Sequence, residues 1–360
     1  MACNNMEFKI LSHAGLLVTA DSGKTLVCDP WLIGSSYWRS WWNYPPVSRS
    51  LVHSLQPDYI YLTHIHWDHF HGPSLKKFSL DTCIIVPKGN FSRMKNDLNY
   101  LGFHRVVELK HGETMELAPD LSITSYQIWM FLDSAALIQC NGITLLNLND
   151  SKHMGPTLQQ IIRKHPAIDF VFRSHSSANE RLSYTIVDEP DTPVDDIESY
   201  IEDFANTVRA TGARYAIPFA SNHCHLHKDS WHFNDSIQHP GLVQQYFNKN
   251  NITYPEVQVM ASGDSWNSSS GFRLSHIKWF ENREQHLLKY LNENQETLNS
   301  FYLEEDKAIV DPAHVQRYFK KLSRALPLLV RYYFRKARFT YVLKKNGRPA
   351  YIFEVNIATG

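Results

Sequence analysis

Four side chains that could bind metal ions stand within six positions in the first quarter of the chain. Segment 63–69 reads THIHWDH, which contains the spacing HxHxDH, and it follows a predicted strand over 59–62. Two imidazoles two residues apart at a strand end lie on one face and can bind one cation, while the aspartate and histidine of the next turn reach a second. Imidazole with carboxylate suits zinc, iron or manganese, and a pair of such ions activates water or dioxygen. The spacing therefore predicts a metal centre at His64, His66, Asp68 and His69, with Asp68 also catalytic.

Short strands alternate with helices around this motif. Runs rich in β-branched or aromatic residues, bounded by Gly, Pro or Asp, predict strands over 8–11, 16–19, 25–28, 59–62, 83–86 and 214–219. Helices are predicted over 92–100 and 156–164, and a third follows Pro193, with apolar residues at helical spacing from Ile197 to Val208. No dinucleotide or P-loop glycine motif occurs. This order predicts a mixed sheet sandwich covered by helices, of the α/β (α+β) class.

Composition narrows the class of protein further. The chain has 360 residues, of which 43% are hydrophobic and 20% charged, so it has enough apolar material for a packed core and is not disordered or collagen-like. No apolar run approaches the ~18 residues of a membrane span, and the N-terminus lacks the features of a secretory signal. The five cysteines are scattered and form no CxxC. These features predict a cytoplasmic enzyme with a small-molecule substrate.

The character of the chain changes after about residue 275. Polar helices are predicted over 279–298 and 312–325, followed by a hairpin that turns at Asn346-Gly347. We therefore divide the chain into a catalytic domain, 1–274, and a basic accessory domain, 275–360. Residues 301–360 carry 12 Lys and Arg against 5 acids, a net charge of +7. This basic face could meet a phosphate, a nucleic acid or an acidic protein, or it could be a solvated face without a partner.

Three features resemble the metallo-β-lactamase superfamily. They are the HxHxDH motif, Asp29-Pro30-Trp31 after a predicted buried strand, and Asp150 at the end of the apolar run 145–150. The resemblance covers about residues 7 to 230 and implies an αββα sandwich. It also implies that Asp150 bridges the two metal ions and shares the catalytic role of Asp68.

Two ligand positions depart from the superfamily's pattern. Where a third histidine usually stands, segment 127–134 contains none, and Asp133 is the one candidate ligand. Where the last histidine usually follows a strand end, this chain has Ala220. The last ligand is therefore open among His175, His223, His225 and His227, of which His175 and His227 are taken as the leading candidates.

The segments 133–150 and 218–227 resemble one branch, the cytidine-monophosphate N-acetylneuraminic acid hydroxylases, which are iron-dependent monooxygenases. A carboxylate in place of a neutral imidazole adds negative charge and a hard donor, which stabilises ferric states. The resemblance therefore favours a di-iron, O2-dependent oxygenase acting on a small polar metabolite. The alternative is a zinc or manganese hydrolase of a lactone, amide or phosphoester. A degenerate scaffold without activity is disfavoured because the motif and Asp150 are intact.

That branch also carries the paired cysteine and histidine motifs of a Rieske domain, which this chain lacks. Electrons for an oxygenase would then come from another protein, and the basic C-terminal face is a candidate docking surface for an acidic ferredoxin or flavodoxin. No nucleic acid is expected as a partner.

An aromatic run over 37–46 is the last candidate feature. It could form an apolar lid that excludes water from the metals, with Trp41 and Trp42 contacting substrate. It could equally be a surface loop folded onto its own aromatic residues. His225 is a further candidate substrate contact.

Overall fold

The computed structural model describes residues 5–89, 92–128, 133–151, 154–176, 197–309, 311–345 and 348–359. The chain divides into two compact units, Met1–Asn294 and Gln295–Gly360. Across the described helices, none combines the length and the apolar character that crossing a membrane requires.

The boundary lies 20 residues beyond the one drawn from the sequence, after residue 294 instead of 274. Residues 275–294 belong to the first unit because they pack on it. Leu287 is buried, and the Tyr44 hydroxyl donates a hydrogen bond to the carbonyl of Trp279.

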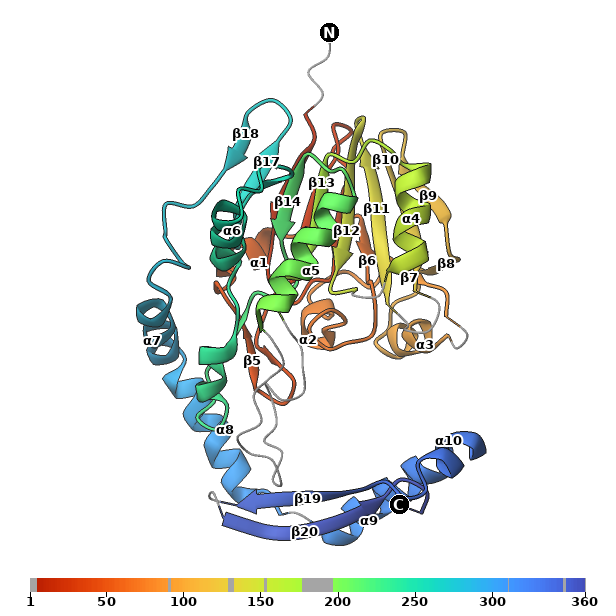
Figure 1. Ribbon diagram of the computed structural model, residues 1–360, viewed down its shortest axis with the longest axis vertical. Helices are drawn as coiled ribbons and strands as arrows, with labels where there is room; N and C mark the ends of the chain where they lie inside the picture. The colour runs from red at the N-terminus through yellow and green to blue at the C-terminus, as the bar shows by residue number, and fades with distance from the viewer. Residues whose placement is uncertain are drawn as a thin grey trace. The chain divides into compact units, whose positions relative to one another are not determined.

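The first unit contains two large sheets that face each other (Figure 1). One has eight strands, in the order β18 (Gly271–Arg273), β17 (Ser265–Asn267), β1 (Glu7–Ile10), β2 (Leu16–Thr19), β3 (Thr25–Cys28), β6 (Tyr59–Tyr61), β7 (Cys83–Pro87) and β8 (Val106–Leu109). The other has seven strands, in the order β16 (Glu256–Val257), β14 (Tyr215–Pro218), β13 (Phe170–Arg173), β12 (Ile143–Asn149), β11 (Ser134–Cys140), β10 (Leu121–Gln127) and β9 (Glu113–Ala118). The predicted strands are present, with ends that differ by one or two residues at most.

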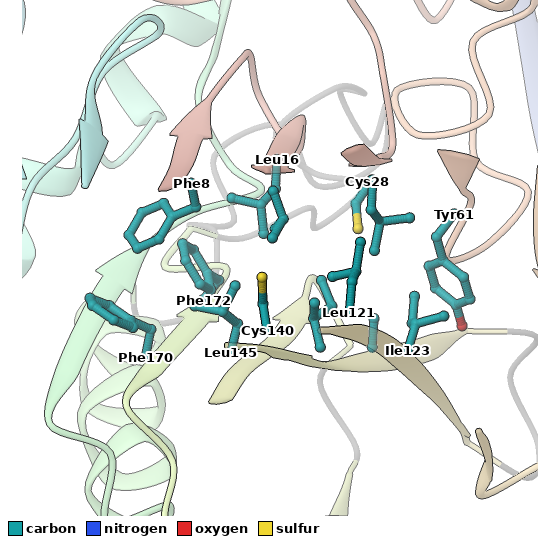
Figure 2. Packing of buried hydrophobic residues seen from close by; sticks show 14 of the residues in the cluster. Phe8, Leu16, Cys28, Tyr61, Leu121, Ile123, Cys140, Leu145, Phe170 and Phe172 are labelled. Carbon is teal, nitrogen blue, oxygen red and sulfur yellow. The ribbon is translucent and has the colours of Figure 1, made fainter. Parts of the chain in front are cut away.

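The core between the sheets is built by alternation along each strand. In β11, Ala136 and Ile138 face the opposite sheet, whereas Ala135 and Leu137 face a helical layer. Figure 2 shows this interior, where Phe8 and Leu16 of one sheet meet residues such as Phe170 and Phe172 of the other. The rings of Phe8 and Phe170 lie edge to face at 4.9 Å.

Helices cover the outer face of each sheet, which gives four layers. The seven-stranded sheet is covered by α4 (Gly155–Lys164), α5 (Ile197–Ala210) and α6 (Pro240–Lys249). The eight-stranded sheet is covered by α1 (Arg49–Ser54), α2 (Gly72–Leu75) and α3 (Arg93–Tyr100). The predicted αββα sandwich is confirmed.

Smaller elements complete the first unit. A three-stranded sheet consists of β15 (His223–His225), β5 (Trp41–Asn43) and β4 (Ser35–Ser36). A 3-10 helix spans Trp231–Ser236, and α7 spans Arg283–Glu293.

The second unit contains α8 (Gln295–Lys307), α9 (Pro312–Ala325), α10 (Leu328–Tyr333) and the hairpin of β19 (Arg338–Lys345) and β20 (Arg348–Asn356). The single helix predicted over 279–298 is wrong, because Asn294 ends α7 and α8 begins at the next residue. The helix predicted over 312–325 is confirmed as α9, and the hairpin is present. The predicted turn at Asn346-Gly347 lies outside the described residues.

Candidate metal centre

The candidate ligands gather at one edge of the sandwich because several strands end there. β3 and β6 are parallel neighbours, and β1 runs the same way because two antiparallel pairings separate it from β3. The chain therefore leaves β1, β3 and β6 at one edge of the eight-stranded sheet. In the facing sheet β12, β13 and β14 are also parallel to one another. Strand ends from both sheets can thus contribute to one site.

The first group of potential ligands is His64, His66 and Asp150, and their donor atoms all lie within 4.8 Å of one another. His64 Nε2 is 2.8 Å from His66 Nδ1 and 3.6 Å from Asp150 Oδ2. The two histidines follow β6, and Asp150 follows β12 of the other sheet. The group therefore joins the two layers.

The second group is His13, Asp68 and His69, all of them buried. Asp68 Oδ2 is 3.0 Å from His13 Nε2 and 3.5 Å from His69 Nε2. His13 lies in the turn between β1 and β2. It is thus a candidate for the last ligand, which the sequence left open among four later histidines.

Asp150 reaches both groups. Its Oδ2 is 3.6 Å from His69 Nε2, the same distance as from His64 Nε2. Such distances are too long for good hydrogen bonds, but they suit two ligands that each stand roughly 2.0–2.2 Å from a shared ion. His69 Nε2 and Asp150 Oδ1 are buried without a hydrogen-bond partner. Buried polar atoms normally have a hydrogen-bond partner, so these two unpaired atoms are suited to coordinate metal ions.

Asp29 orients the ring of His69 through Nδ1, the nitrogen that does not face Asp68 and Asp150. Asp29 is fully buried, and its Oδ2 lies 2.8 Å from His69 Nδ1. The backbone N–H and the hydroxyl of Thr63 also donate to this carboxylate, at 2.8 and 2.6 Å. A proton on Nδ1 leaves Nε2 of His69 free to bind a metal, the usual arrangement of a carboxylate behind a ligating histidine.

The charges around His69 also favour a cation. Burial lowers the pKa of this imidazole, but the carboxylates of Asp150, Asp68 and Asp29 outweigh burial and raise it to about 10. Without a metal, His69 would therefore be protonated, because the three carboxylates stabilise its positive charge. A divalent ion can supply it instead.

Asn149 shapes the turn that presents Asp150. Its backbone is left-handed, with φ 44°, and its side chain donates to the carbonyl of Ser134 at 2.8 Å. The side-chain oxygen accepts the N–H of Asp150 at 2.7 Å. Asparagine tolerates this conformation better than most residues. The Asp150 carboxylate, which lies near both groups, is thus positioned by local backbone geometry.

An aromatic loop borders the second group. Tyr37, Trp38 and Arg39 are three successive non-glycine residues with positive φ, at 46°, 53° and 74°, and such backbone costs roughly 1–3 kcal/mol per residue. The Tyr37 hydroxyl donates to Asp68 Oδ1 at 2.7 Å. The loop forms one wall of a cavity of about 550 Å³.

Of the predicted lid residues, Trp41 lies at the site. It stacks on His223 with ring centroids 3.7 Å apart, and its centroid is 6.0 Å from that of His13. Trp42 is buried, its indole N–H donates to the carbonyl of Arg39, and its ring packs against Tyr290. A substrate contact by Trp42 would require it to leave this packing.

Asp133 is in neither group. It is close enough to His64 that its charge favours the protonated imidazole, although burial has the larger effect and lowers the pKa of His64. Its backbone carbonyl accepts a hydrogen bond from Ile128. The structure therefore gives Asp133 an electrostatic influence on the first group and a position outside the ligand cluster.

None of the four later histidines belongs to a ligand group either. His175 is fully buried and neither ring nitrogen has a hydrogen-bond partner. His225 lies 3.1 Å from the Ser40 hydroxyl, and His227 Nδ1 accepts the N–H of Asp229. His223 alone among them touches a residue of the second group, with its ring centroid 5.8 Å from that of His13.

Sequence reasoning missed His13, Tyr37 and the role of Asp29. Asp29 carried a signal, since the Asp-Pro-Trp turn was recognised without a function. His13 carried only a weak one, a lone histidine in a turn after a short strand. Its proximity to Asp68 depends on two strand pairings that no local pattern reveals.

Comparisons with known proteins agree with the fold. A solved structure from Veillonella parvula, described as a "possible metal-dependent hydrolase", matches with a TM-score of 0.51 at 14% identity over 73% of this chain and 99% of that one. No protein-family model matches. Four layers, the HxHxDH motif after β6 and the aspartate after β12 together define the class: the chain has the metallo-β-lactamase fold.

Two curated relatives share parts of the sequence. A protein of Mycobacterium tuberculosis, provisionally named a Rieske 2Fe-2S iron-sulfur protein, is 27% identical over 256 residues, 66% of this chain and 48% of that protein. The human inactive cytidine monophosphate-N-acetylneuraminic acid hydroxylase is 38% identical over 80 residues, 22% of this chain and 16% of that protein. The chain thus spans about half the length of the first relative and less of the second.

Proposed function

We propose that the chain is a di-iron enzyme that uses O2 to hydroxylate a small polar metabolite. The observation that carries the proposal is the donor set: each group offers two imidazoles and one carboxylate, and Asp150 is within reach of both. Two histidines and one carboxylate with open positions are typical of non-haem iron oxygenases. The partial likeness to a hydroxylase and to an iron-sulfur protein supports redox chemistry.

In this proposal the side chains of the site have two roles, metal binding and support of the ligands. His64, His66 and Asp150 would hold one ion, and His13, Asp68 and His69 the other. Bound iron would supply the activation of dioxygen. Asp29 keeps the His69 tautomer fixed, and the ring of Trp41, stacked on His223, excludes water from the side of the second group.

The electrons would come from an acidic redox protein, a ferredoxin or flavodoxin, docked on the C-terminal unit. Residues 312–360 carry eleven Lys and Arg and a single acid, Glu354. Lys320, Lys321 and Arg324 are exposed on α9. Such a surface attracts an acidic protein at low salt. Reversing these three charges to Glu should slow reductase-coupled turnover at low ionic strength; unchanged turnover would refute this docking site.

Metal analysis tests the proposal most directly. Protein purified without chelators should contain close to two irons per chain and show the optical absorption of oxygen-bridged iron. Asp150→Asn should lower the iron content, because it weakens both groups, whereas Asp120→Asn, on a distant turn, should leave the iron content unchanged. Stoichiometric zinc, with no turnover in Fe(II), O2 and reductant, would refute the oxygenase.

The second candidate is a zinc or manganese hydrolase of a lactone, amide or phosphoester. The similar fold described as a "possible metal-dependent hydrolase" favours it, and zinc also accepts two histidines with a carboxylate. A screen of the freshly purified protein against lactones and phosphodiesters separates the two candidates. Hydrolysis that depends on zinc and on Asp150 would support this alternative.

A further inference from the structure

Helix α10 of the second unit turns an apolar face outward. None of its six residues is buried. Four of its side chains, Leu328, Leu329, Tyr332 and Tyr333, are 80%, 79%, 65% and 77% exposed. Leu328 and Tyr332 are four positions apart, as are Leu329 and Tyr333, so all four side chains lie on one side of the helix. An exposed apolar face of this kind marks a surface that binds a partner.

The opposite side of α10 is attached to the rest of the second unit. The guanidinium of Arg331 donates two hydrogen bonds, of 3.1 and 2.9 Å, to the carbonyl of Ala358. Val330 and Arg331 are the two residues of the helix that are partly covered. These contacts hold the apolar side outward, which reverses the usual orientation of a surface helix in a globular protein.

Positive charge accompanies this face. Residues 312–353 contain eleven Lys and Arg and no Asp or Glu. The next acid along the chain, Glu354, forms an ion pair with Arg338 at 2.7 Å. The guanidinium of Arg335 lies over the ring of Tyr332, 4.3 Å from its centroid, and Lys336 is exposed beside it in sequence. Cations therefore border the apolar face itself, and the unit attracts anions.

Charge and apolar surface together select the partner. A second copy of this chain would bring two strongly basic surfaces together, and these repel each other. A nucleic acid would pair with the cations and stack on the tyrosines, but it offers the two leucines no apolar environment. The acidic redox protein proposed above is assigned to the cations of α9 and does not account for the exposed leucines of α10. A bilayer with anionic lipid matches both features.

We propose that α10 binds the second unit to the surface of a bilayer that contains anionic lipid. Leu328 and Leu329 enter the boundary between headgroups and acyl chains, and the tyrosines lie at the level of the headgroups. Arg335 and Lys336 pair with lipid phosphates. Six residues are too few to cross a bilayer, so the helix lies in the interface. This attachment does not depend on the metal ions or on the reaction.

Cosedimentation of the purified 360-residue chain with lipid vesicles tests the proposal. One set of vesicles is pure phosphatidylcholine, and in the other a third of the lipid is phosphatidylglycerol. At low salt the protein should bind the anionic vesicles roughly tenfold more tightly than the neutral ones, or better, since each cation near an anionic surface contributes about fivefold. Added salt should weaken the binding, because it screens these charges.

Variants separate the apolar contribution from the charged one. Leu328→Ser combined with Leu329→Ser should weaken binding to the anionic vesicles roughly tenfold, because it removes the side chains that enter the bilayer. Lys336→Gln should weaken it roughly fivefold. Leu288→Ser, which replaces an exposed leucine of α7 in the first unit, should not change it. Circular dichroism confirms that each variant is folded.

Three outcomes would overturn the proposal. The first is no binding to the anionic vesicles. The second is binding that the leucine substitutions leave unchanged, because a surface that attracts any polyanion, whether nucleic acid or acidic protein, needs only the cations. The third is a dimer, detected by sedimentation velocity, that the same substitutions dissociate, which would assign α10 to a second copy of the chain.

Discussion

Asp150, His69 and Asp29 form one continuous line of polar contacts. Asp29 fixes the tautomer of His69, and the other ring nitrogen of His69 faces Asp68 and Asp150. Unlike charges hold these residues together, but the three carboxylates exceed what a single imidazolium can neutralise. The candidate ligands therefore carry an excess of negative charge, which a bound cation would neutralise.

His13 gives the sharpest test of a two-ion centre. His13→Ala should remove about half of the bound metal, because it takes one of the two imidazoles from the second group and leaves the first group intact. Metal content measured by mass spectrometry checks this, with His111→Ala, an exposed histidine that is in neither group, as the control. Loss of both ions, or of none, would contradict separate groups that share Asp150.

At the scale of elements, the site depends on where strands stop. β1, β3 and β6 end at one edge of their sheet, and β12 brings Asp150 to it from the facing sheet. Strand β12 is buried along almost its whole length, as expected for a strand with a sheet on one side and helices on the other. Its last residue then adopts a left-handed conformation that turns the chain toward the ligands.

Asn149 carries that turn. Asn149→Ala should lower the free energy of unfolding by roughly 2–4 kcal/mol, since it removes one buried and one partly buried hydrogen bond and puts alanine in a left-handed conformation that asparagine tolerates better. Asn149→Gly relieves the backbone strain and still lacks the hydrogen bonds, so it should fall between Ala and the parent. Urea unfolding measures all three proteins. An alanine variant as stable as the parent would show that the turn does not depend on this side chain.

At the scale of the molecule, burial of polar groups links the stability of the first unit to pH. Burial lowers the pKa of His71 to about 4, of His225 to about 4 and of His175 to about 3. In the unfolded chain each histidine would titrate near 6.5. The unfolded state therefore takes up more protons below that pH, and stability is lost as the pH falls from about 6.5 toward these folded values.

Each of these histidines should contribute a slope of about 1.4 kcal/mol per pH unit in that window. His71→Gln should remove one such contribution, and His276→Gln, on the exposed surface, should leave the slope unchanged. Urea unfolding between pH 7 and 5 gives the slopes. A His71 variant with the parent's slope would show that this imidazole is protonated in the folded protein.

The sequence alone predicted a mixed sheet sandwich covered by helices, the strands around the motif and four candidate metal ligands, because each of these depends on residues close together in the chain. The αββα arrangement came from the family resemblance. HxHxDH needs only a strand end and a turn, and hydrophobic alternation predicts which faces are buried. The resemblance added Asp150. Such short-range patterns can be recognised in the sequence without knowledge of the tertiary structure.

Only the tertiary structure decided the rest of the site. His13 lies next to Asp68 through sheet pairing across 55 residues, and Asp133, close to Asp150 in sequence, lies outside the ligand groups. The division after residue 294 likewise follows from the packing of α7 on the first unit, which cannot be inferred from amino-acid composition. Contacts between distant segments arise from the register and order of strands, and no single stretch of sequence encodes them.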